Sequence, residues 1–149
     1  MAIERATIKD VPDLCTLLNY LFEKEAEFKP SREAQTRGLS EIINGNGAGD
    51  ILVLRRAGEI IAMVNLIYIV STAFGSRVAI LEDMVVLPKY RDQGTGSKLL
   101  DYAIQFAKEQ GCKRISLLTD DDNYHAHRFY QKHGFSRSSM LTFRITLSD

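Results

Sequence analysis

The sequence is poor in cysteine and has no surplus of either charge. Its two cysteines, Cys15 and Cys112, stand far apart and lack the spacing of metal ligands, so we expect free thiols, a reducing cytoplasm and no metal site. The 19 basic and 19 acidic residues give a formal net charge of zero at pH 7. The chain has no basic field and no block of Lys and Arg that would attract the negative charge of nucleic acid or of a membrane surface. We therefore expect neither as a partner.

Long apolar runs are also absent. The longest is far shorter than the ~20 residues that a membrane-spanning helix needs. The first residues, MAIERATIKD, lack the apolar centre of a signal peptide, which again favours a cytoplasmic protein. A length of 149 residues with 45% hydrophobic content is enough for one ordinary domain, which we expect to span residues 1–149.

Apolar periodicity and turn residues predict an α+β chain around one mixed, mostly antiparallel sheet. We expect four helices, at residues 11–25, 31–43, 97–110 and 124–133. We expect six to seven strands, at residues 3–8, 50–55, 60–70, 77–87 and 114–119, with a last hairpin or pair of strands within 135–147.

The predicted order also fixes how the strands pair. The three strands before the helix at 97–110 follow one another through short connections, so they should pair antiparallel. A strand, helix and strand over residues 77–119 imply parallel pairing through a right-handed crossover.

The most informative stretch is LEDMVVLPKYRDQGTGSKLL, residues 81–100. Its apolar run indicates a buried strand, which Pro88 should end because proline cannot donate to a sheet ladder. A loop with two glycines follows at 91–96, and we expect a helix to begin at Ser97. Glycines let backbone N–H groups approach a ligand, and a helix N-terminus adds further N–H groups and a positive dipole end. The stretch therefore suits an anion, with phosphate the usual ligand.

Neither common phosphate-binding motif is present in this stretch. Residues 96–98, GSK, match only the end of a Walker loop, and the Rossmann fingerprint fails because residue 99 is leucine. The pattern present is Arg91-x-x-Gly94-x-Gly96, and a tight turn without a ligand is the plain alternative for it.

A second motif, NYHAHRFYQKHGF at residues 123–135, lies near the C-terminus. It resembles the N-x-x-A-x-x-F-Y-x-x-x-G-F motif of the GCN5-related N-acetyltransferase (GNAT) superfamily at every named position. The loop pattern resembles the pyrophosphate loop of the same superfamily, [RQ]-x-x-G-x-[GA]. Both motifs stand in the family order on the predicted elements, and the element order resembles a GNAT domain over essentially the whole chain.

The resemblance implies a fold and an activity. The fold would be the GNAT acyl-CoA N-acyltransferase fold, with a sheet that splays between the fourth and fifth strands. The activity would be acetyl transfer from acetyl-CoA, as cosubstrate, to a primary amine of a small molecule by direct attack in a ternary complex. A covalent acetyl-cysteine route is not favoured, because neither cysteine lies in the two motifs.

The resemblance also implies where acetyl-CoA would bind. Backbone groups of the fourth strand would pair with its pantetheine arm, and the glycine loop would hold its pyrophosphate. Asp92 departs from the small residue that is common at its position, so its carboxylate should point away from the phosphates. The expected cofactor-binding residues are Met84, Val85, Val86, Arg91, Asp92, Gln93, Gly94, Thr95, Gly96, Ser97, Asn123, Ala126 and Tyr130.

The catalytic roles implied by the resemblance fall to three side chains. Tyr130 matches the family tyrosine that protonates the departing thiolate; its alternative is a core aromatic. Glu82 and Asp83 are candidates to accept the amine proton, to bind the ammonium or only to pair with a basic neighbour. Simple strand alternation places Glu82 with Met84 and Val86, and Asp83 with Val85, on opposite faces. A backbone N–H near Val85 or Val86 would stabilise the oxyanion.

The acceptor amine is less defined. The segments GSKLL, AHRFY and FRITL look like the aminoalkylphosphonate N-acetyltransferase branch, which implies a small amine that carries an anion. A non-catalytic acyl-CoA-binding sensor, an acetyltransferase acting on a protein amine and a nucleotide-binding P-loop protein are the alternatives. A homodimer is an open expectation.

Overall fold

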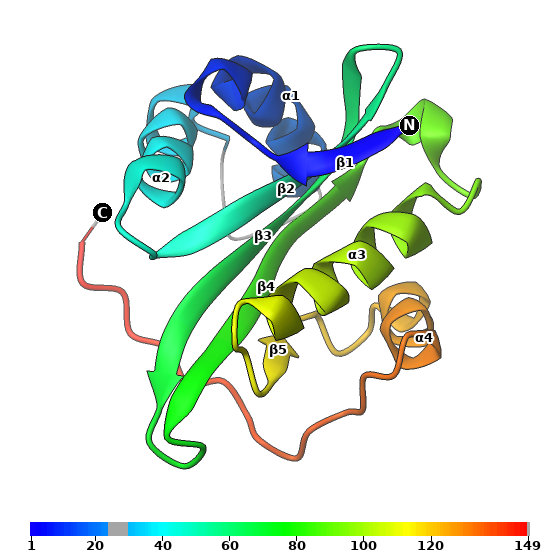
Figure 1. The fold of residues 1–149 in the computed structure, drawn as a ribbon. Coiled ribbons are helices and arrows are strands. Elements are labelled where there is room, and N and C mark those ends of the chain that lie inside the picture. Colours follow the sequence, from blue (N-terminus) through cyan, green and yellow to red (C-terminus); the bar gives the residue numbers. More distant parts are fainter. Residues whose placement is uncertain (24–29, 149) are drawn as a thin grey trace. The chain divides into compact units, whose positions relative to one another are not determined.

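The structure is a computed structural model that describes residues 1–23 and 30–148 (Figure 1). By internal contacts the chain divides into two units, residues 1–118 and 119–149, and each is described by itself. A single domain over residues 1–149 stays a prediction. Within the described ranges, no helix is long and apolar enough to cross a membrane.

The first unit is built on one five-stranded sheet whose strands lie side by side in chain order. The first four strands pair antiparallel, and the fifth joins the fourth in parallel, so both predicted pairing modes are confirmed. The strands are β1 (Ala2–Arg5), β2 (Gly49–Arg56), β3 (Glu59–Ser71), β4 (Ser76–Val86) and β5 (Ile115–Leu117).

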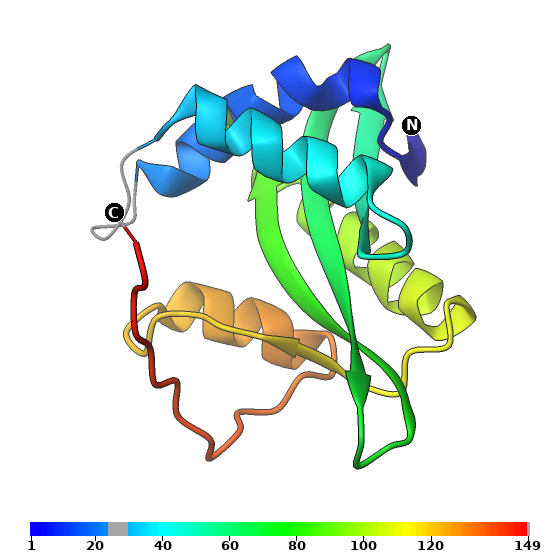
Figure 2. The same cartoon turned by 90° about the vertical axis from the view of Figure 1, so that its left-hand side faces the viewer.

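Three helices cover this sheet, and Figure 2 shows α1 and α2 on one side of the strands and α3 on the other. Two short 3-10 helices precede α1 and α3. The bounds are η1 (Ile8–Asp10), α1 (Val11–Phe22), α2 (Arg32–Asn44), η2 (Pro88–Tyr90) and α3 (Thr95–Glu109). The predicted end of the first helix at Glu25 lies outside the described residues.

The core follows from the apolar stripes of these helices. Leu14 and Cys15 of α1 are 0% exposed and pack with Met63 of β3 and Val85 of β4. On the other side of the sheet, the stripe of α3 is fully buried, with Leu99, Leu100, Ala103 and Ala107 all 0% exposed. Because helices cover both faces, the middle of β3 is apolar without alternation except at Asn65, as expected for a strand buried on both sides.

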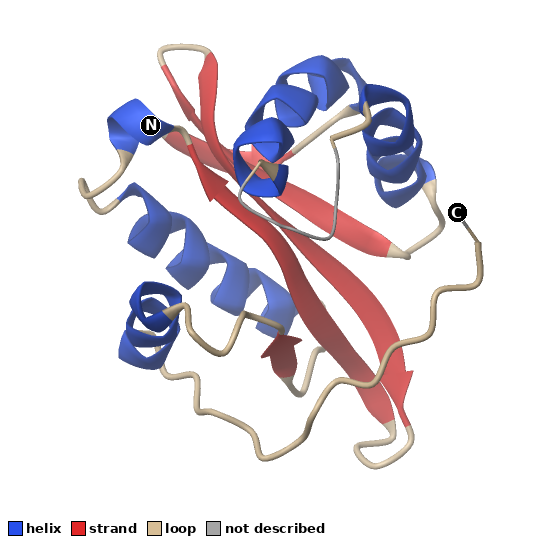
Figure 3. Ribbon diagram, turned by 180° about the vertical axis from the view of Figure 1, so that it is seen from behind, coloured by secondary structure: helices blue, strands red, loops and turns tan. Residues whose placement is uncertain are grey.

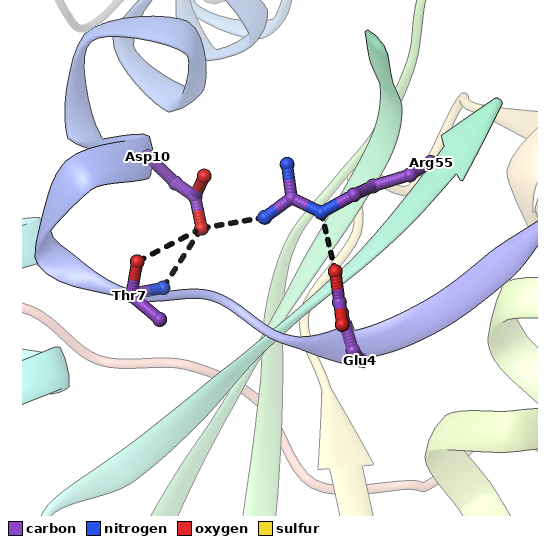
Figure 4. A network of polar contacts seen from close by, with 4 residues as sticks. All are labelled: Glu4, Thr7, Asp10 and Arg55. Carbon is purple, nitrogen blue, oxygen red and sulfur yellow. Dashed lines mark hydrogen bonds and ion pairs between the residues drawn. The ribbon is translucent and has the colours of Figure 1, made fainter. Parts of the chain in front are cut away.

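A polar cluster fixes the start of α1 to the sheet (Figure 4). Asp10 accepts hydrogen bonds from the Thr7 backbone N–H and from Nη2 of Arg55 in β2, each at 2.8 Å. Arg55 also donates through Nε to Glu4 of β1. Burial by itself raises the pKa of Asp10, but these hydrogen bonds and the Arg55 charge outweigh burial and hold that pKa below its usual value.

In its described residues, 119–148, the second unit contains one helix, α4 (Tyr124–Lys132), followed by a segment without regular structure over residues 135–148 (Figure 3). The predicted last hairpin or pair of strands within 135–147 is therefore wrong, and the described sheet has five strands instead of six to seven. Apolar content alone does not make a strand, because a strand also needs a partner strand for its ladder hydrogen bonds.

Candidate active site

The outer edge of β4 is paired along only part of its length. Strand β5 pairs with Ala79–Leu81 of β4, and the pairing ends at Leu81 opposite Leu117. Residues 82–86 continue β4 beyond that point while keeping their antiparallel partner β3 on the other side. This stretch contains all the candidate residues that the sequence placed on the fourth strand, and the predicted splay would begin here.

A β-bulge interrupts β4 within this stretch. Met63 of β3 pairs with Val85, but Asn65 pairs with Glu82, so β4 carries one extra residue between the two pairs. Asp83 sits in the bulge with a φ of +54°. This left-handed conformation is uncommon for residues other than glycine, although aspartate tolerates it better than most.

The bulge corrects the predicted distribution of side chains over the two faces. Met63 and Asn65 lie two apart on β3 and so share a face, and their partners Val85 and Glu82 share it with them. The predicted grouping of Glu82 with Val86 is wrong, because the extra residue shifts the alternation by one. The side chain of Glu82 is exposed.

Asp83 is held by a residue that the sequence prediction missed. Its Oδ2 accepts a hydrogen bond of 2.7 Å from Nδ2 of Asn65, which is 1% exposed. The Oδ1 atom of Asn65 is buried and has no hydrogen-bond partner among the described residues. The available signal was a single amide inside the apolar run 60–67 of β3.

The loop after β4 is ordered by its own side chains. Arg91 donates through Nε to the carbonyl of Val86 at 3.1 Å, and Gln93 donates to the carbonyl of Lys89 at 2.9 Å. Asp92 has a φ of +61°. Arg91, expected to bind the cofactor, thus holds the end of β4 through this hydrogen bond.

Helix α3 begins at Thr95, two residues earlier than predicted. Gly94 takes the N-cap position with a φ of +78°, and the Lys98 N–H bonds to its carbonyl at 3.1 Å. Gly96 therefore lies in the first helical turn and not in the loop. The N–H groups of a first helical turn have no acceptor inside their own helix and point toward its N-terminal end.

In the second unit, the side chain of Asn123 caps α4. Its Oδ1 accepts from the Ala126 N–H at 3.2 Å, and His127 contacts the Asp120 carbonyl through Nε2 at 2.8 Å. The two residues Asn123 and Ala126, both expected to bind the cofactor, are therefore partners in a helix cap. Their contact with a cofactor stays a prediction.

Tyr130 lies on α4 among aromatic side chains. Its ring meets those of Phe129 and Phe135 edge to face, with centroids 5.2 Å and 5.6 Å away. Burial raises the pKa of the Tyr130 phenol to about 12. The hydroxyl is therefore protonated at neutral pH, as a proton donor must be.

Comparison with known proteins assigns the family. The sequence model of the acetyltransferase (GNAT) family matches residues 14–135, which is most of the chain. The chain belongs to this family. N-acetyl transfer is the enzyme class that the family and the curated relatives of this GNAT chain share.

Two curated relatives match almost full length. Over 144 residues, 97% of this chain and 88% of the relative, the GNAT chain is 28% identical to the aminoalkylphosphonate N-acetyltransferase of Salmonella typhimurium. It is also 28% identical to the uncharacterized N-acetyltransferase YhfO of Bacillus subtilis. That match spans 141 residues, which are 93% of this chain and 92% of the relative. A possible acetyltransferase from Clostridium difficile 630 has the same fold, with a TM-score of 0.89, 14% identity, and coverage of 99% of this chain and 98% of that one.

One open hollow of about 480 Å³ lies in the first unit of this GNAT chain, between α1 and the adjoining ends of β3 and β4. Lys89 and Glu59 form an ion pair of 3.8 Å at its rim. None of the residues predicted for the site lines it; the lining residues are Asp13, Thr16, Leu17, Tyr20, Glu59, Ile60, Leu87, Pro88 and Lys89.

Proposed function

We propose that this protein transfers the acetyl group of acetyl-CoA to a primary amine of a small molecule by direct attack in a ternary complex. The observation that carries the proposal is the coincidence of two features in one continuous stretch. Residues 82–86 of β4 run past the end of β5, and the α3 N-terminus follows after a short glycine loop. In the proposal, the first feature binds a peptide-like arm and the second binds a pyrophosphate.

The residues present suit acetyl-CoA. Backbone groups of Met84, Val85 and Val86 would pair with the pantetheine amides, which resemble a strand in their spacing of donors and acceptors. The N–H groups from Arg91 to Ser97 would bind the pyrophosphate, with the positive end of the α3 dipole behind them. Lys98 adds a cation in the same turn.

The proposed chemistry has two proton transfers, one from the acceptor ammonium and one to the departing thiolate. An alkylammonium has a pKa near ~10, so a carboxylate of β4, Glu82 or Asp83, accepts its proton before attack. As the nitrogen bonds to the carbonyl carbon, a backbone N–H of Val85 or Val86 donates to the developing oxyanion. The C–S bond then breaks, and Tyr130 gives its proton to the sulfur and regains one from solvent.

The aminoalkylphosphonate relative supports a finer hypothesis for the acceptor, namely a small amine that also carries an anionic group. Such a substrate needs a cation beside the acceptor site, and Arg32, Arg37, Arg77 and Arg137 are the candidates. A cytoplasmic location and assembly as a homodimer belong to the same proposal.

The test is release of CoA from acetyl-CoA over a panel of amines. The panel contains 2-aminoethylphosphonate, thialysine, glucosamine 6-phosphate, spermidine, an aminoglycoside and a peptide with a free N-terminus. We expect at least one small amine to be acetylated. A folded protein that binds acetyl-CoA but acetylates only the peptide contradicts a small-molecule acceptor, and one that acetylates nothing favours a sensor.

Tyr130→Phe is run beside the wild type. We expect turnover to fall by ~10²–10⁴-fold, the usual worth of acid catalysis, with nearly unchanged affinity for acetyl-CoA. Tyr102→Phe, which removes the hydroxyl of an exposed tyrosine on α3, is the matched control and should keep full turnover. Equal turnover in both variants would mean that another group or solvent protonates the thiolate.

A further inference from the structure

Asn65 is out of place by the ordinary rules of a buried strand. It lies in the apolar middle of β3, is 1% exposed and stands between Ile51 of β2 and Glu82 of β4 in the register. A buried amide destabilises the fold unless all its polar atoms find partners. Asn65 satisfies only one side of its amide, because Oδ1 has no partner among the described residues.

The orientation of the Asn65 amide is fixed by one neighbour. Nδ2 donates to Oδ2 of Asp83 at 2.7 Å, and the reverse orientation would set Oδ1 against a carboxylate oxygen. The bond reaches across the bulge to the residue whose backbone is in the strained, left-handed conformation. A buried donor therefore holds the carboxylate of a strained residue in one position.

The neighbouring acid, Glu82, differs from Asp83 in its surroundings. Glu82 is exposed, whereas Asp83 is partly buried and bound to a side chain that cannot move without disturbing the core. Asn65 shares its face of the sheet with Met63 and Val85, on the side of α1 and α2. Asp83 is thus the more rigidly placed of the two candidate acids on the stretch of β4 beyond the end of β5.

We propose that Asn65 is a positioning residue that holds the carboxylate of Asp83 to receive the ammonium group of the acceptor. The inference rests on the proposed function and deepens it by choosing between the two acids. In the step concerned, an N–H bond of the ammonium breaks, an O–H bond forms on Asp83, and the neutral amine keeps the electron pair that attacks the acetyl carbon. Asp83 later releases the proton to solvent.

The test compares Asn65→Leu with wild type, using acetyl-CoA and the panel amines. Leucine removes the buried unpaired oxygen, which should stabilise the fold, and also the donor to Asp83, which should destabilise it. The two effects oppose each other, so we expect little change in melting temperature. We expect kcat/KM for the amine to fall roughly 10- to 100-fold, the usual worth of a hydrogen bond to a charged group. The acid limb of the pH profile should move to higher pH, because a lost donor disfavours the ionised carboxylate.

Gln35→Leu is the matched control. Gln35 of α2 is also a buried amide, 7% exposed, with an unpaired oxygen and a single bond of 3.2 Å to Asn19. It contacts no candidate acid in β4, so its replacement should leave kcat/KM and the pH profile unchanged. If Gln35→Leu loses as much kcat/KM as Asn65→Leu, the loss in Asn65→Leu comes from general disturbance of the core and not from Asp83.

A double-mutant cycle with Asp83→Asn shows whether Asn65 acts through Asp83. Asparagine tolerates the left-handed backbone, so this variant keeps the bulge while removing the charge. We expect it to lose ~10²–10⁴-fold in kcat/KM, and Asn65→Leu should add nothing in that background. If Asn65→Leu folds poorly, Asn65→Val replaces it with a side chain suited to a strand.

The outcomes separate the inference from the function beneath it. The positioning role is overturned if Asn65→Leu keeps the wild-type turnover. It is also overturned if Asn65→Leu lowers kcat/KM by the same factor in the Asp83→Asn background as in the wild type. Neither result contradicts the proposed acetyltransferase activity. A wild-type protein inert toward every panel amine overturns both.

Discussion

At the scale of single residues, Gly94 and Gly96 at the start of α3 have different backbone requirements. Gly94 carries a positive φ as N-cap of α3, and a side chain there is strained whatever space surrounds it. Gly96 has no such backbone requirement, because it lies inside the first helical turn. We expect the glycine at position 96 to leave room for a pyrophosphate at the helix end.

Gly96→Asp tests that point, because stability and binding should move in opposite directions. An aspartate in a first helical turn stabilises a helix by about 0.3–1 kcal/mol through the dipole. The same charge would repel a pyrophosphate, so we expect the Kd for acetyl-CoA to rise by ~10-fold or more, about 1.4 kcal/mol. Calorimetric titration and thermal melting measure the two effects.

Gly38→Asp serves as the control for this substitution. Gly38 also lies in a helix, α2, and nothing surrounds the position of its Cβ. Its replacement should leave the Kd for acetyl-CoA unchanged. An unchanged Kd in Gly96→Asp as well would contradict the placement of the pyrophosphate at α3.

At the scale of elements, the Asp10 cluster joins β1, the start of α1 and β2. Because its pKa is lowered in the folded protein, Asp10 adds stability that is fully present above its unfolded pKa and is lost as pH falls through its folded pKa. We expect Asp10→Asn to lower the free energy of unfolding by roughly 1–3 kcal/mol at pH 7. The difference from wild type should shrink toward zero in the acidic range below pH ~4.

Urea unfolding at a series of pH values measures this difference. Asp13→Asn, at an exposed acid in the first turn of α1, is the control and should change the pH dependence much less. A loss of stability in Asp10→Asn that is the same at every pH would show that shape, not charge, holds the cluster together.

The elements that sequence reasoning located are those with local signals. The helices predicted at 11–25 and 97–110 and the strands predicted at 50–55 and 60–70 rest on apolar periodicity and turn residues within a few positions. Pairing of β4 with β5 also followed, because a helix between two strands leaves them parallel. The start of α3 was misplaced because Gly94 can serve as N-cap as well as loop residue.

The features that were missed depend on contacts far apart in the chain. The bulge at Asp83 is not visible in the letters LEDMVV, because it arises from the register with β3. Asn65 and Asp83 are 18 positions apart, so their hydrogen bond appears only when the two strands pair. The last predicted strands were wrong for the same reason, since the apolar content of residues 135–147 does not identify a partner strand.

At the scale of the whole molecule, the two loop-and-helix motifs stand in different compact units, residues 1–118 and 119–149. The family match runs across the boundary between these units, from residue 14 to residue 135. If one ligand engages both motifs, both units must gain stability from it together. A ligand that binds only the folded chain stabilises it by about 2.7 kcal/mol at 100 times its Kd.

Thermal unfolding with and without acetyl-CoA therefore tests function and domain organisation at once. We expect one transition for residues 1–149, raised by roughly 5–10 °C at a saturating concentration. ATP and GTP, the ligands of a P-loop protein, should not raise it. A tenfold rise in Kd in Gly96→Asp should remove about half of the acetyl-CoA effect at 100 times the wild-type Kd. Two transitions, with only the first unit stabilised, would mean that acetyl-CoA binds without the α4 motif, and Tyr130 could not then be the residue that protonates the thiolate.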